Sequence, residues 1–493
     1  MKGVRVDYAG RKALVVGLGD TGLSCVRWLL AHGAQVRAVD TRATAPHAER
    51  LRAEYPELAI GLGMLNAADF DWAEMIVVSP GVAVATPEIA RAAAAGKDVV
   101  GDIELFARAL PEMGYAPQVL AITGSNGKST VTALTGHLCR TAGRHTAVAG
   151  NIGQPVLDAL AQVEDAVSWP EVWVLELSSF QLETTASLAP DAATVLNLSE
   201  DHMDRYASMA DYAAAKARIF GPLVPHAAPQ PKRTQVLNRD DPLVMKMVRP
   251  GWRLWTFGLS TGFQPGEWGL TERGHERWLA EGTTPLLPVE HLPIAGLHNA
   301  ANALAALALA RAIDLPYAPL LEGLATFQGL PHRVEKVAEI DGVTWYDDSK
   351  GTNVGATVAA LNGLTQPVVL IAGGDGKGQD FNPLREAVAR TRCVILIGRD
   401  APRIEAAIAG AARCLHAESL EAAVQLARQE AQPGDAVLLS PACASFDMFR
   451  NYVHRAEVFV AAVRALQPCS PPGSGPGQAL TPHPSPRGGR DVS

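Results

Sequence analysis

One short stretch of the sequence has the composition of a phosphate-binding loop. Residues 123–130 are Thr-Gly-Ser-Asn-Gly-Lys-Ser-Thr. Gly124 and Gly127 allow backbone N–H groups to face an anion, and a helix that begins after the loop adds the positive end of its dipole. Lys128 can then reach the terminal phosphates of a nucleotide, and a hydroxyl group directly after it can ligate Mg²⁺. The usual pattern has a glycine five residues before the Gly-Lys pair, where this chain has Ile122, so the loop is a variant one.

The residues around this loop predict the two elements that must hold it. The apolar run 119–122 before it has the composition of a buried strand, and Val131, Leu134 and Leu138 after it follow a helical spacing. A strand that leads through a glycine loop into a helix is the geometry of a phosphate cradle. The alternative is a glycine turn before an ordinary helix, which the Lys-Ser-Thr run at the helix start disfavours.

A second glycine turn lies near the N-terminus. The apolar run 13–16 leads into Gly-Leu-Gly-Asp-Thr-Gly at 17–22, and a helical stretch, another apolar run and Asp40 follow. This order is the fingerprint of dinucleotide-binding units, in which an acid about twenty residues after the glycines contacts the ribose. By itself the pattern indicates a phosphate-bearing nucleotide at the helix start, either NAD or a UDP compound.

Composition limits the class of protein. The chain has 493 residues, 48% hydrophobic and 19% charged, which is enough for about three globular domains. Its formal net charge of -8 argues against nucleic acid as the main partner. The six cysteines are scattered without a close pair, so neither a zinc site nor a disulfide framework is indicated. With no signal peptide pattern and no long uncharged apolar run, we expect a cytoplasmic protein without a membrane partner.

Short apolar runs alternate with alanine-rich helical stretches along most of the chain, which predicts an α/β protein with parallel sheets. The alternation restarts after Gly101 and again after the Gly-Leu-Pro break at 329–331. We therefore expect an N-terminal Rossmann-like domain, a central P-loop-type ATPase domain and a C-terminal Rossmann-like α/β domain. The predicted bounds are 1–101, 102–330 and 331–466, with a disordered Pro- and Gly-rich tail at 467–493. Within the central domain we expect a surface excursion at 221–234, whereas the pattern of 251–293 does not distinguish strands from turns.

Ionisable residues follow several predicted strands, at the sheet edge where α/β proteins build ligand sites. Glu176 ends one apolar run, and His202 lies in an acidic loop beyond the next. An acid at a strand end is as often a helix cap, and a single histidine is more often structural than a metal ligand. Their shared location favours the functional interpretation. In the third domain, the loop 373–377 suits either a ligand contact through Lys377 or a simple tight turn.

Five motifs in order carry a family resemblance. They are Thr123–Thr130, Glu176–Glu183, Glu200–Asp204, His298-Asn299-x-x-Asn302 and Leu330–Arg333. This set resembles the Mur ligase family, the ATP-dependent amide-forming enzymes of peptidoglycan precursor synthesis, and the resemblance extends from about residue 12 to 466. Within the family, the segments 17–24, 178–183, 348–353 and 440–447 are most similar to members that join D-glutamate to UDP-N-acetylmuramoyl-L-alanine.

The resemblance implies a mechanism and its cofactors. Such ligases use ATP to phosphorylate a substrate carboxylate, and an amine then attacks the acyl phosphate to form an amide. Two Mg²⁺ sites are implied, together with a carbamylated lysine that corresponds to Lys216, because a carbamate offers Mg²⁺ the oxygen that an amine lacks. The implied catalytic residues are Lys128, His202 and Lys216, and the implied metal ligands are Ser129, Thr130, Glu176, His202 and Lys216.

The remaining site residues follow from the same resemblance, and all implied partners are small molecules bound by a monomer. The residues expected at ATP are Gly124, Asn126, Gly127, Lys128, Ser129, Thr130, Asn299, Asn302, Arg333 and Asp348. The residues expected at the UDP-muramoyl substrate are Thr21, Asp40, Thr41 and Asn151. The residues expected at D-glutamate are Lys350, Thr352, Lys377, Ser445 and Tyr452.

Other activities stay open at this point. A related ligase that adds L-alanine or a third residue would share the fold, as would folylpolyglutamate synthase, although the N-terminal glycine unit argues against the last. A dehydrogenase would leave the Lys128 loop without a role, and a nucleotide-binding module would bind ATP without ligation. ATP turnover that depends on both an amino acid and the UDP-muramoyl compound would distinguish these alternatives.

Overall fold

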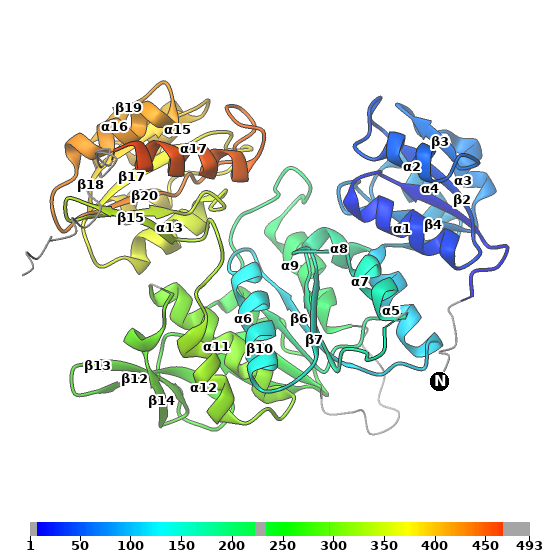
Figure 1. Cartoon of the computed structure of the whole chain (residues 1–493), viewed down its shortest axis with the longest axis horizontal. Coiled ribbons are helices and arrows are strands. Elements are labelled where there is room, and N and C mark those ends of the chain that lie inside the picture. The colour runs from blue at the N-terminus through cyan, green and yellow to red at the C-terminus, as the bar shows by residue number, and fades with distance from the viewer. Residues whose placement is uncertain (1–6, 165, 222–232, 295, 467–493) are drawn as a thin grey trace, which may run out of the picture.

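The computed structural model describes residues 7–164, 166–221, 233–294 and 296–466. These residues form three lobes, each built around one sheet, with an N-lobe (β1–β5) and a C-lobe (β15–β20) on either side of a central lobe (β6–β14) (Figure 1). The predicted tail, 467–493, and most of the predicted excursion at 221–234 lie outside the described residues. Among the described helices, none is long and apolar enough to cross a bilayer.

The N-lobe contains a five-stranded parallel sheet in the order β3-β2-β1-β4-β5. Its elements are β1 (Lys12–Val16), α1 (Asp20–Ala31), β2 (Gln35–Asp40), α2 (Ala48–Glu54), β3 (Ala59–Leu62), α3 (Ala67–Trp72), β4 (Met75–Val78), α4 (Pro87–Ala94) and β5 (Asp98–Val100). Successive residues of β1 point to opposite faces: Ala13 and Val15 pack with residues of α1, whereas Leu14 and Val16 pack with residues of α3 and α4. The sheet is therefore covered on both faces, as parallel sheets require.

The central lobe contains a nine-stranded sheet in the order β14-β13-β12-β11-β10-β9-β6-β8-β7. Its strands are β6 (Gln118–Thr123), β7 (Thr146–Gly150), β8 (Val172–Glu176), β9 (Ala192–Val195), β10 (Thr234–Asn238), β11 (Arg253–Phe257), β12 (Glu267–Arg273), β13 (Glu276–Glu281) and β14 (Thr284–Pro288). Its helices are α5 (Asp102–Glu112), α6 (Lys128–Thr141), α7 (Val156–Glu164), α8 (Ser179–Glu183), α9 (Met209–Ala217), η1 (Arg218–Phe220), α10 (Pro242–Met245), η2 (Val289–His291), α11 (Leu297–Ala312) and α12 (Tyr317–Thr326). The stretch that the sequence left unassigned forms β11 and an antiparallel extension, β12 to β14.

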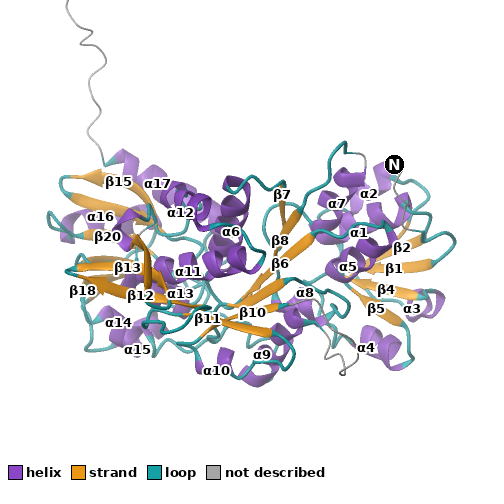
Figure 2. Ribbon diagram, turned by 90° about the horizontal axis from the view of Figure 1, so that it is seen from below, coloured by secondary structure: helices purple, strands orange, loops and turns teal. Residues whose placement is uncertain are grey.

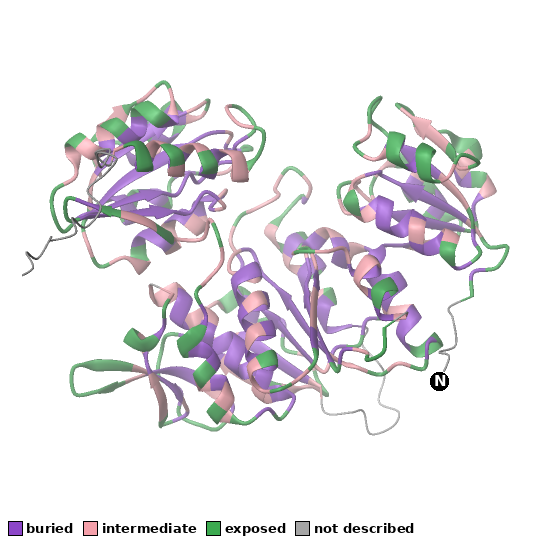
Figure 3. Cartoon of the chain, viewed as in Figure 1, coloured by how far each residue is buried: buried purple, intermediate pink, exposed green. Residues whose placement is uncertain are grey.

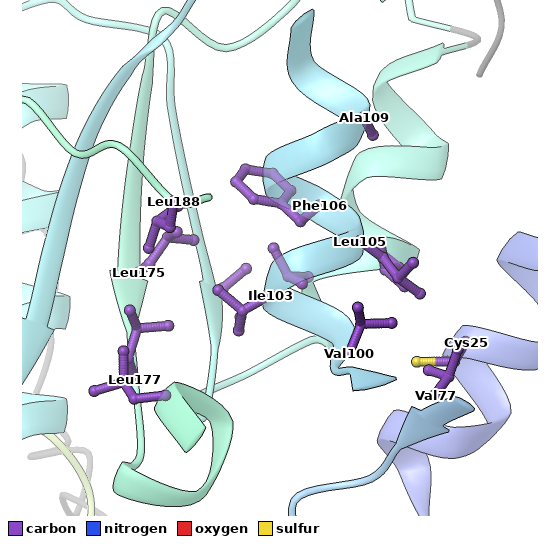
Figure 4. Close-up of a cluster of buried hydrophobic side chains, with 14 of the residues drawn as sticks. Cys25, Val77, Val100, Ile103, Leu105, Phe106, Ala109, Leu175, Leu177 and Leu188 are labelled. Atoms are coloured by element: carbon purple, nitrogen blue, oxygen red, sulfur yellow. The ribbon is translucent and has the colours of Figure 1, made fainter. Parts of the chain in front are cut away.

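Hydrophobic residues of β6 alternate between two cores. Leu120 and Ile122 pack with residues of α6 and α11, whereas Val119 and Ala121 belong to a cluster that also contains residues of α5, α7 and α1. Figure 4 shows Phe106 and Ile103 of α5 facing β8, whereas Leu105 lies on the other side of the helix, toward Val100 and Cys25 of the N-lobe. The N-lobe and the central lobe are therefore joined by one continuous hydrophobic core.

The C-lobe contains a six-stranded sheet in the order β15-β16-β20-β17-β18-β19, parallel except for β15. Its elements are β15 (Glu335–Ile340), β16 (Val343–Asp347), α13 (Val354–Gly363), β17 (Val368–Gly373), α14 (Leu384–Val388), β18 (Thr391–Ile397), α15 (Ala401–Ile408), β19 (Cys414–His416), α16 (Leu420–Glu430), β20 (Ala436–Leu439) and α17 (Tyr452–Ala465). Hydrophobic clusters cover both faces of the sheet, and over the described ranges they contain no residue of the other two lobes. Buried strands run through the middle of each lobe (Figure 3). Helix α13 of the C-lobe lies beside α11 of the central lobe (Figure 2).

The turn between β1 and α1 depends on one close backbone approach. A Cβ atom on Gly22 would lie 1.9 Å from the carbonyl oxygen of Gly17, so no larger residue fits there without movement of the turn. Gly19, in the same turn, has φ -80°, and apart from its chain neighbours no atom of the described residues lies within 4 Å of a Cβ position there. The same substitution should therefore have different effects at these two glycines.

We predict that Gly22→Ala lowers the free energy of unfolding by about 1–3 kcal/mol, the usual cost of an overpacked contact. Gly19→Ala, the matched control, should change it by less than about 0.5 kcal/mol. Urea denaturation of both variants checks this. Equal stability of the two would contradict the close approach at Gly22.

Candidate active site

The predicted phosphate loop connects β6 to α6 and depends on two glycines with positive φ. Gly124 has φ +153° and Gly127 has φ +82°, both in a region that side chains disfavour. A Cβ on Gly124 would meet Leu196 at 2.9 Å, and one on Gly127 would meet the Asn302 side-chain oxygen at 2.6 Å. The Asn126 backbone N–H donates to the Asn197 side chain at 2.8 Å. The loop is thus held in one shape by its neighbours.

Two lysines converge on one carbonyl oxygen of this loop. The Lys128 Nζ donates to the Gly124 and Ser125 carbonyls at 2.9 Å, and the Lys216 Nζ donates to the same Gly124 oxygen at 2.9 Å. Lys216 is only 1% exposed, and its Nζ lies 4.5 Å from the ring centre of Tyr212. Burial lowers the pKa of Lys128, and burial together with the nearby Lys128 charge lowers the pKa of Lys216 well below its usual value. The Lys216 amine is therefore biased toward its neutral, nucleophilic form.

The helix that carries Lys216 is shorter than the sequence pattern predicts. In the sequence, the i, i+4 spacing of Tyr212, Lys216 and Phe220 predicts a helix over 212–220 with these three residues on one face, but α9 ends at Ala217 and a 3-10 turn covers 218–220. The Tyr212 and Lys216 pair keeps its i, i+4 contact, since both residues lie within α9.

A buried carboxylate faces the lysines from the end of β8. Glu176 is 1% exposed, and its Oε1 accepts a hydrogen bond from the Asn151 side chain at 2.7 Å. Its Oε2 is buried and has no hydrogen-bond partner among the described residues. Because a carboxylate oxygen buried without a partner is costly, this atom has the properties of a ligand position for a hard cation such as Mg²⁺.

Hydroxyl groups at the start of α6 complete a set of oxygen donors. Ser129 and Thr130 are both buried at the first turn of the helix, and the Ser129 hydroxyl accepts a hydrogen bond from Arg333 at 2.7 Å. Hydroxyl and carboxylate oxygens are the donors that Mg²⁺ prefers, so the residues present fit this ion.

His202 lies in the loop that follows β9. It has φ +58°, its ring lies 4.6 Å from that of Phe180, and its Nε2 lies 3.5 Å from the Asp201 carboxylate. Burial lowers the pKa of His202, the Asp201 charge opposes this, and Lys377, Lys128 and Lys216 add to it. A neutral imidazole can accept a hydrogen bond or ligate a metal, which a protonated one cannot.

A cleft of about 670 Å³ separates the N-lobe from the central lobe. Four of the residues predicted from the sequence line it together: Thr21, Asp40, Thr41 and Asn151. Arg27, Arg42 and Arg50 also line it, which suits an anionic ligand. Through the bond from Asn151 to Glu176, one wall of the cleft adjoins the phosphate loop.

Asp40 also holds the glycine turn of the cleft. Its carboxylate accepts the Leu18 backbone N–H at 2.7 Å, and it accepts two side-chain hydrogen bonds from Arg42 at 2.9 and 2.7 Å. Burial raises the pKa of Asp40, but these hydrogen bonds outweigh it and lower the pKa to about 2. Asp40 thus holds the glycine turn in place. Its own side chain is buried, whereas the side chain of its partner Arg42 is half exposed.

The C-lobe contacts the phosphate loop through polar side chains. Arg333 bonds to Ser129, and the Asn353 side chain donates to Asn126 at 3.1 Å and to Asp201 at 3.4 Å. Within the central lobe, the Asn302 side chain of α11 donates to the Asn299 side chain at 3.0 Å, so these two predicted residues lie together. Asp348 is buried and accepts from the Ser440 hydroxyl at 2.7 Å; burial raises the pKa of Asp348 to about 7, with Ser440 and Arg333 opposing the shift.

Four of the residues predicted to bind D-glutamate lie on loops that meet at the C-terminal ends of β16, β17 and β20, and the fifth, Tyr452, is the first residue of α17. The Lys350 Nζ lies 5.1 Å from the Tyr452 ring centre, and the Ala444 and Asp375 backbones pair, which places the loop of Lys377 beside that of Ser445. Thr352 is half-buried two residues after Lys350. Lys377 is exposed with φ +50°, whereas Ser445 is buried.

The geometry adds residues that the sequence analysis did not assign. Asn197 and Asn353 hold the phosphate loop from two lobes, and Gln181 lines the cleft. Asn353 and Gln181 lie inside the motifs quoted from the sequence, so their importance could have been predicted. Their contact partners could not, because these are too distant in the sequence.

Models of three protein-family domains match the chain in order. Residues 11–101 match the Mur ligase MurD-like N-terminal domain, residues 122–310 the Mur ligase middle domain, and residues 332–443 the Mur ligase glutamate ligase domain. The chain belongs to the Mur ligase family. The first and third matches each contain one whole sheet and the second contains the central sheet except for the start of β6, in agreement with the predicted three-part α/β architecture.

Sequence relatives within the Mur ligase family cover nearly the whole chain. The UDP-N-acetylmuramoylalanine--D-glutamate ligase of Thiobacillus denitrificans is 58% identical over 475 residues, which cover 94% of this chain and 98% of that protein. The protein of the same name from Nitrosomonas europaea is 55% identical, with the same two coverages.

Solved structures of the Mur ligase family share the fold at low identity. The UDP-N-acetylmuramate-alanine ligase MurC of Thermotoga maritima has a TM-score of 0.57 at 19% identity and covers 92% of this chain and 100% of its own. MurF of Thermotoga maritima in complex with ADP has a TM-score of 0.56 at 15% identity and covers 93% and 97%.

A buried acid supports the wall of the cleft from the start of α5. Asp102 is 1% exposed; one of its oxygens accepts from the Gln181 side chain at 3.0 Å, and the other has no hydrogen-bond partner in the part of the chain that the structure describes. Burial raises the pKa of Asp102 from 3.8 to about 6, although the Gln181 bond opposes the shift. The folded state therefore holds this proton more tightly than the unfolded chain, and stability falls as the pH rises from about 4 to about 6.

We predict that Asp102→Asn, which removes the charge but keeps an acceptor for Gln181, is more stable than the parent above about pH 6. The gain should reach about 1–3 kcal/mol, from the shift of roughly two pKa units, and should vanish near pH 4. Urea unfolding at several pH values measures it. Asp71→Asn, at a side chain that is 76% exposed, is the control and should show no such trend. A gain that does not change with pH would contradict a raised Asp102 pKa.

Proposed function

We propose that this protein joins D-glutamate to UDP-N-acetylmuramoyl-L-alanine with ATP, through an acyl-phosphate intermediate. One observation carries the proposal: Asn151 lines the cleft between the N-lobe and the central lobe and donates to Glu176 beside the phosphate loop. A long substrate anchored in the cleft by its diphosphate would thus present its far carboxylate next to the γ-phosphate of ATP. The relatives that are 58% and 55% identical carry the name of this activity.

The two halves of the reaction need mainly charge stabilisation and alignment. ATP supplies the phosphoryl group, and Mg²⁺ neutralises charge on its phosphates. We assign Lys128 to the transferred phosphoryl group, since its Nζ already lies at the loop carbonyls. Glu176, Ser129 and Thr130 would hold one Mg²⁺, and His202 a second. Asn126, Asn299, Asn302, Arg333 and Asp348 would contact ATP, with Gly124 and Gly127 giving room for its phosphates.

The first lobe would bind the UDP part of the substrate rather than NAD. The Gly19–Gly22 turn at the start of α1 would take the pyrophosphate, and Thr21 and Thr41 would contact the nucleotide. Asp40 would act through the turn that it holds. We propose domain bounds of 1–101, 102–330 and 331–466, and a monomer that works in the cytoplasm on small-molecule substrates.

Lys216 is proposed to carry a carbamate. Its neutral amine attacks CO₂, an N–C bond forms, one C=O π bond becomes C–O⁻, and the nitrogen releases a proton. The low pKa of the Lys216 amine and its burial beside Lys128 support this, because a new anion there would face a positive charge. The carbamate oxygen could ligate the second Mg²⁺, which an amine cannot do.

We predict that Lys216→Ala reduces ligation by roughly 10²–10³-fold, the cost of losing one group that stabilises transition-state charge. A short carboxylate such as acetate should partly restore the rate, because it can replace the lost oxygen ligand. Steady-state ADP release with and without acetate measures this. Lys246→Ala, at an exposed lysine of the same lobe, is the control and should show neither effect. Full activity of Lys216→Ala would remove the carbamate from the mechanism.

The C-lobe loops are proposed to select D-glutamate. Lys377 would pair with one carboxylate, Lys350, Thr352 and Ser445 would hold the other, and Tyr452 would form one wall of the pocket. An L-isomer fixed by the same two carboxylates would turn its amine away from the acyl phosphate, and misplacement by 1 Å costs about 10²-fold in rate.

We predict that Lys377→Ala and Ser445→Ala raise the KM for D-glutamate at least about tenfold, the effect of one lost charge-assisted bond, with little change in the KM for ATP. Lys336→Ala, at an exposed lysine of β15, is the control and should leave both constants unchanged. Product formation from D-glutamate, L-glutamate and L-alanine tests the proposed function itself. Equal use of L-glutamate would point to another ligase of this family, and ATP binding without product would point to a binding module.

A further inference from the structure

Arg205 crosses the boundary between the central lobe and the N-lobe. Its Nη1 donates to the Pro80 carbonyl at 2.8 Å, and its Nη2 donates to the Val82 carbonyl at 3.1 Å. Pro80 and Val82 belong to the loop after β4, whereas Arg205 follows β9 and His202 in the central lobe. The side chain is 11% exposed, so these bonds are shielded from solvent.

The loop that Arg205 holds is part of the cleft. Residues 79–82 all line the cleft, and the Ser79 hydroxyl donates to the Gly17 carbonyl at 2.7 Å. A Cβ on Gly17 would meet Ser79 and Val82 at 2.9 Å, so this loop packs directly against the glycine turn. A shift of residues 79–82 would therefore move the turn that begins α1.

On its other side Arg205 is fixed to the region of His202. Its Nη2 lies 2.5 Å from the Glu183 carboxylate, which also accepts the Tyr206 hydroxyl at 2.6 Å. The guanidinium lies 4.1 Å from the Phe180 ring centre, and the Phe180 ring packs on His202. Arg205 is thus held on the central-lobe side by Glu183 and Phe180. Its four hydrogen bonds use four of the five guanidinium N–H groups if each bond takes one.

We infer that Arg205 is a positioning residue, which sets the distance between the substrate cleft of the N-lobe and the phosphate loop of the central lobe. The inference rests on the proposed function, in which one substrate is anchored in the cleft and reacts at the phosphate loop. Arg205 acts through the 79–82 loop and through Phe180 and does not itself touch the reacting atoms. Because the core shared by the two lobes is built from hydrophobic side chains, we expect Arg205→Ala to fold with some loss of stability, and its main effect to be on the alignment of the lobes.

The substitution Arg205→Ala separates binding from reaction. UDP should bind the variant with a Kd within about threefold of the parent, because the N-lobe turn is intact. The kcat for ligation should fall about 10–100-fold, as expected for a misalignment of up to about 1 Å, while the KM for ATP stays constant. Arg205→Lys should resemble Arg205→Ala, since one ammonium cannot span two carbonyls and a carboxylate in a fixed fork.

Arg239→Ala is the matched control. Arg239 also donates to two backbone carbonyls, those of Trp268 and Ser260, but both partners lie within the central lobe. It should lose stability as Arg205→Ala does and keep its kcat within about threefold of the parent. A kcat of Arg205→Ala that also stays within about threefold would overturn the inference, as would a parallel loss of UDP affinity, which would make Arg205 part of the binding site.

A measurement without turnover distinguishes failure of the inference from failure of the proposed function. Spin labels at Met64→Cys in the N-lobe and Val248→Cys in the central lobe, both exposed positions, report the distance between the lobes once Cys414 and Cys469 are replaced by serine. Arg205→Ala should broaden this distance distribution and Arg239→Ala should not. An unchanged distribution overturns the inference even in an active enzyme. A parent chain that yields no product with D-glutamate refutes the proposed function and leaves the distance result to decide the role of Arg205.

Discussion

The carbonyl oxygen of Gly124 receives hydrogen bonds from the half-buried Lys128 and the fully buried Lys216, and this shared acceptor organises the site. Two ammonium groups so close in a dry environment repel each other and are poorly solvated, so at least one is favoured as a neutral amine. The buried Glu176 carboxylate opposes the loss of charge on both lysines. The local structure therefore prepares different chemistry for two residues of the same type: Lys128 remains at the loop for phosphate, and Lys216 is set up to react as an amine.

The three lobes are attached in two different ways. A continuous hydrophobic core joins the N-lobe to the central lobe, whereas the C-lobe contacts the phosphate loop through Arg333 and Asn353. Apolar burial is strong and not directional, so polar contacts such as those of Arg205 are needed to define the alignment of the first two lobes. These contacts of Arg333 and Asn353 between the C-lobe and the central lobe are hydrogen bonds, which depend on direction more than on buried area. Such contacts suit a C-lobe that brings one substrate to the phosphate loop of the central lobe.

Most of the fold followed from patterns within the sequence. Apolar runs followed by glycine turns and helical spacing predict α/β units with parallel sheets, since parallel strands are buried on both faces. The strands β12 to β14 could not be predicted, because they are partly exposed, pair with one another in antiparallel fashion and show no clear alternation of apolar and polar residues. The end of α9 at Ala217 was also not predictable, since the 3-10 turn after it has a helical composition.

The chemistry of the phosphate loop was determined by the sequence itself, because the loop, its lysine and its hydroxyl groups are contiguous and their geometry is local. The grouping of Thr21, Asp40, Thr41 and Asn151 in one cleft was decided by the tertiary structure, as was the burial that lowers the pKa of Lys216. The same holds for the bonds of Arg205 to Pro80 and of Asn353 to Asn126, which link residues 125 and 227 positions apart. Contacts at such separations depend on how three sheets pack together, and no local pattern in the chain encodes that packing.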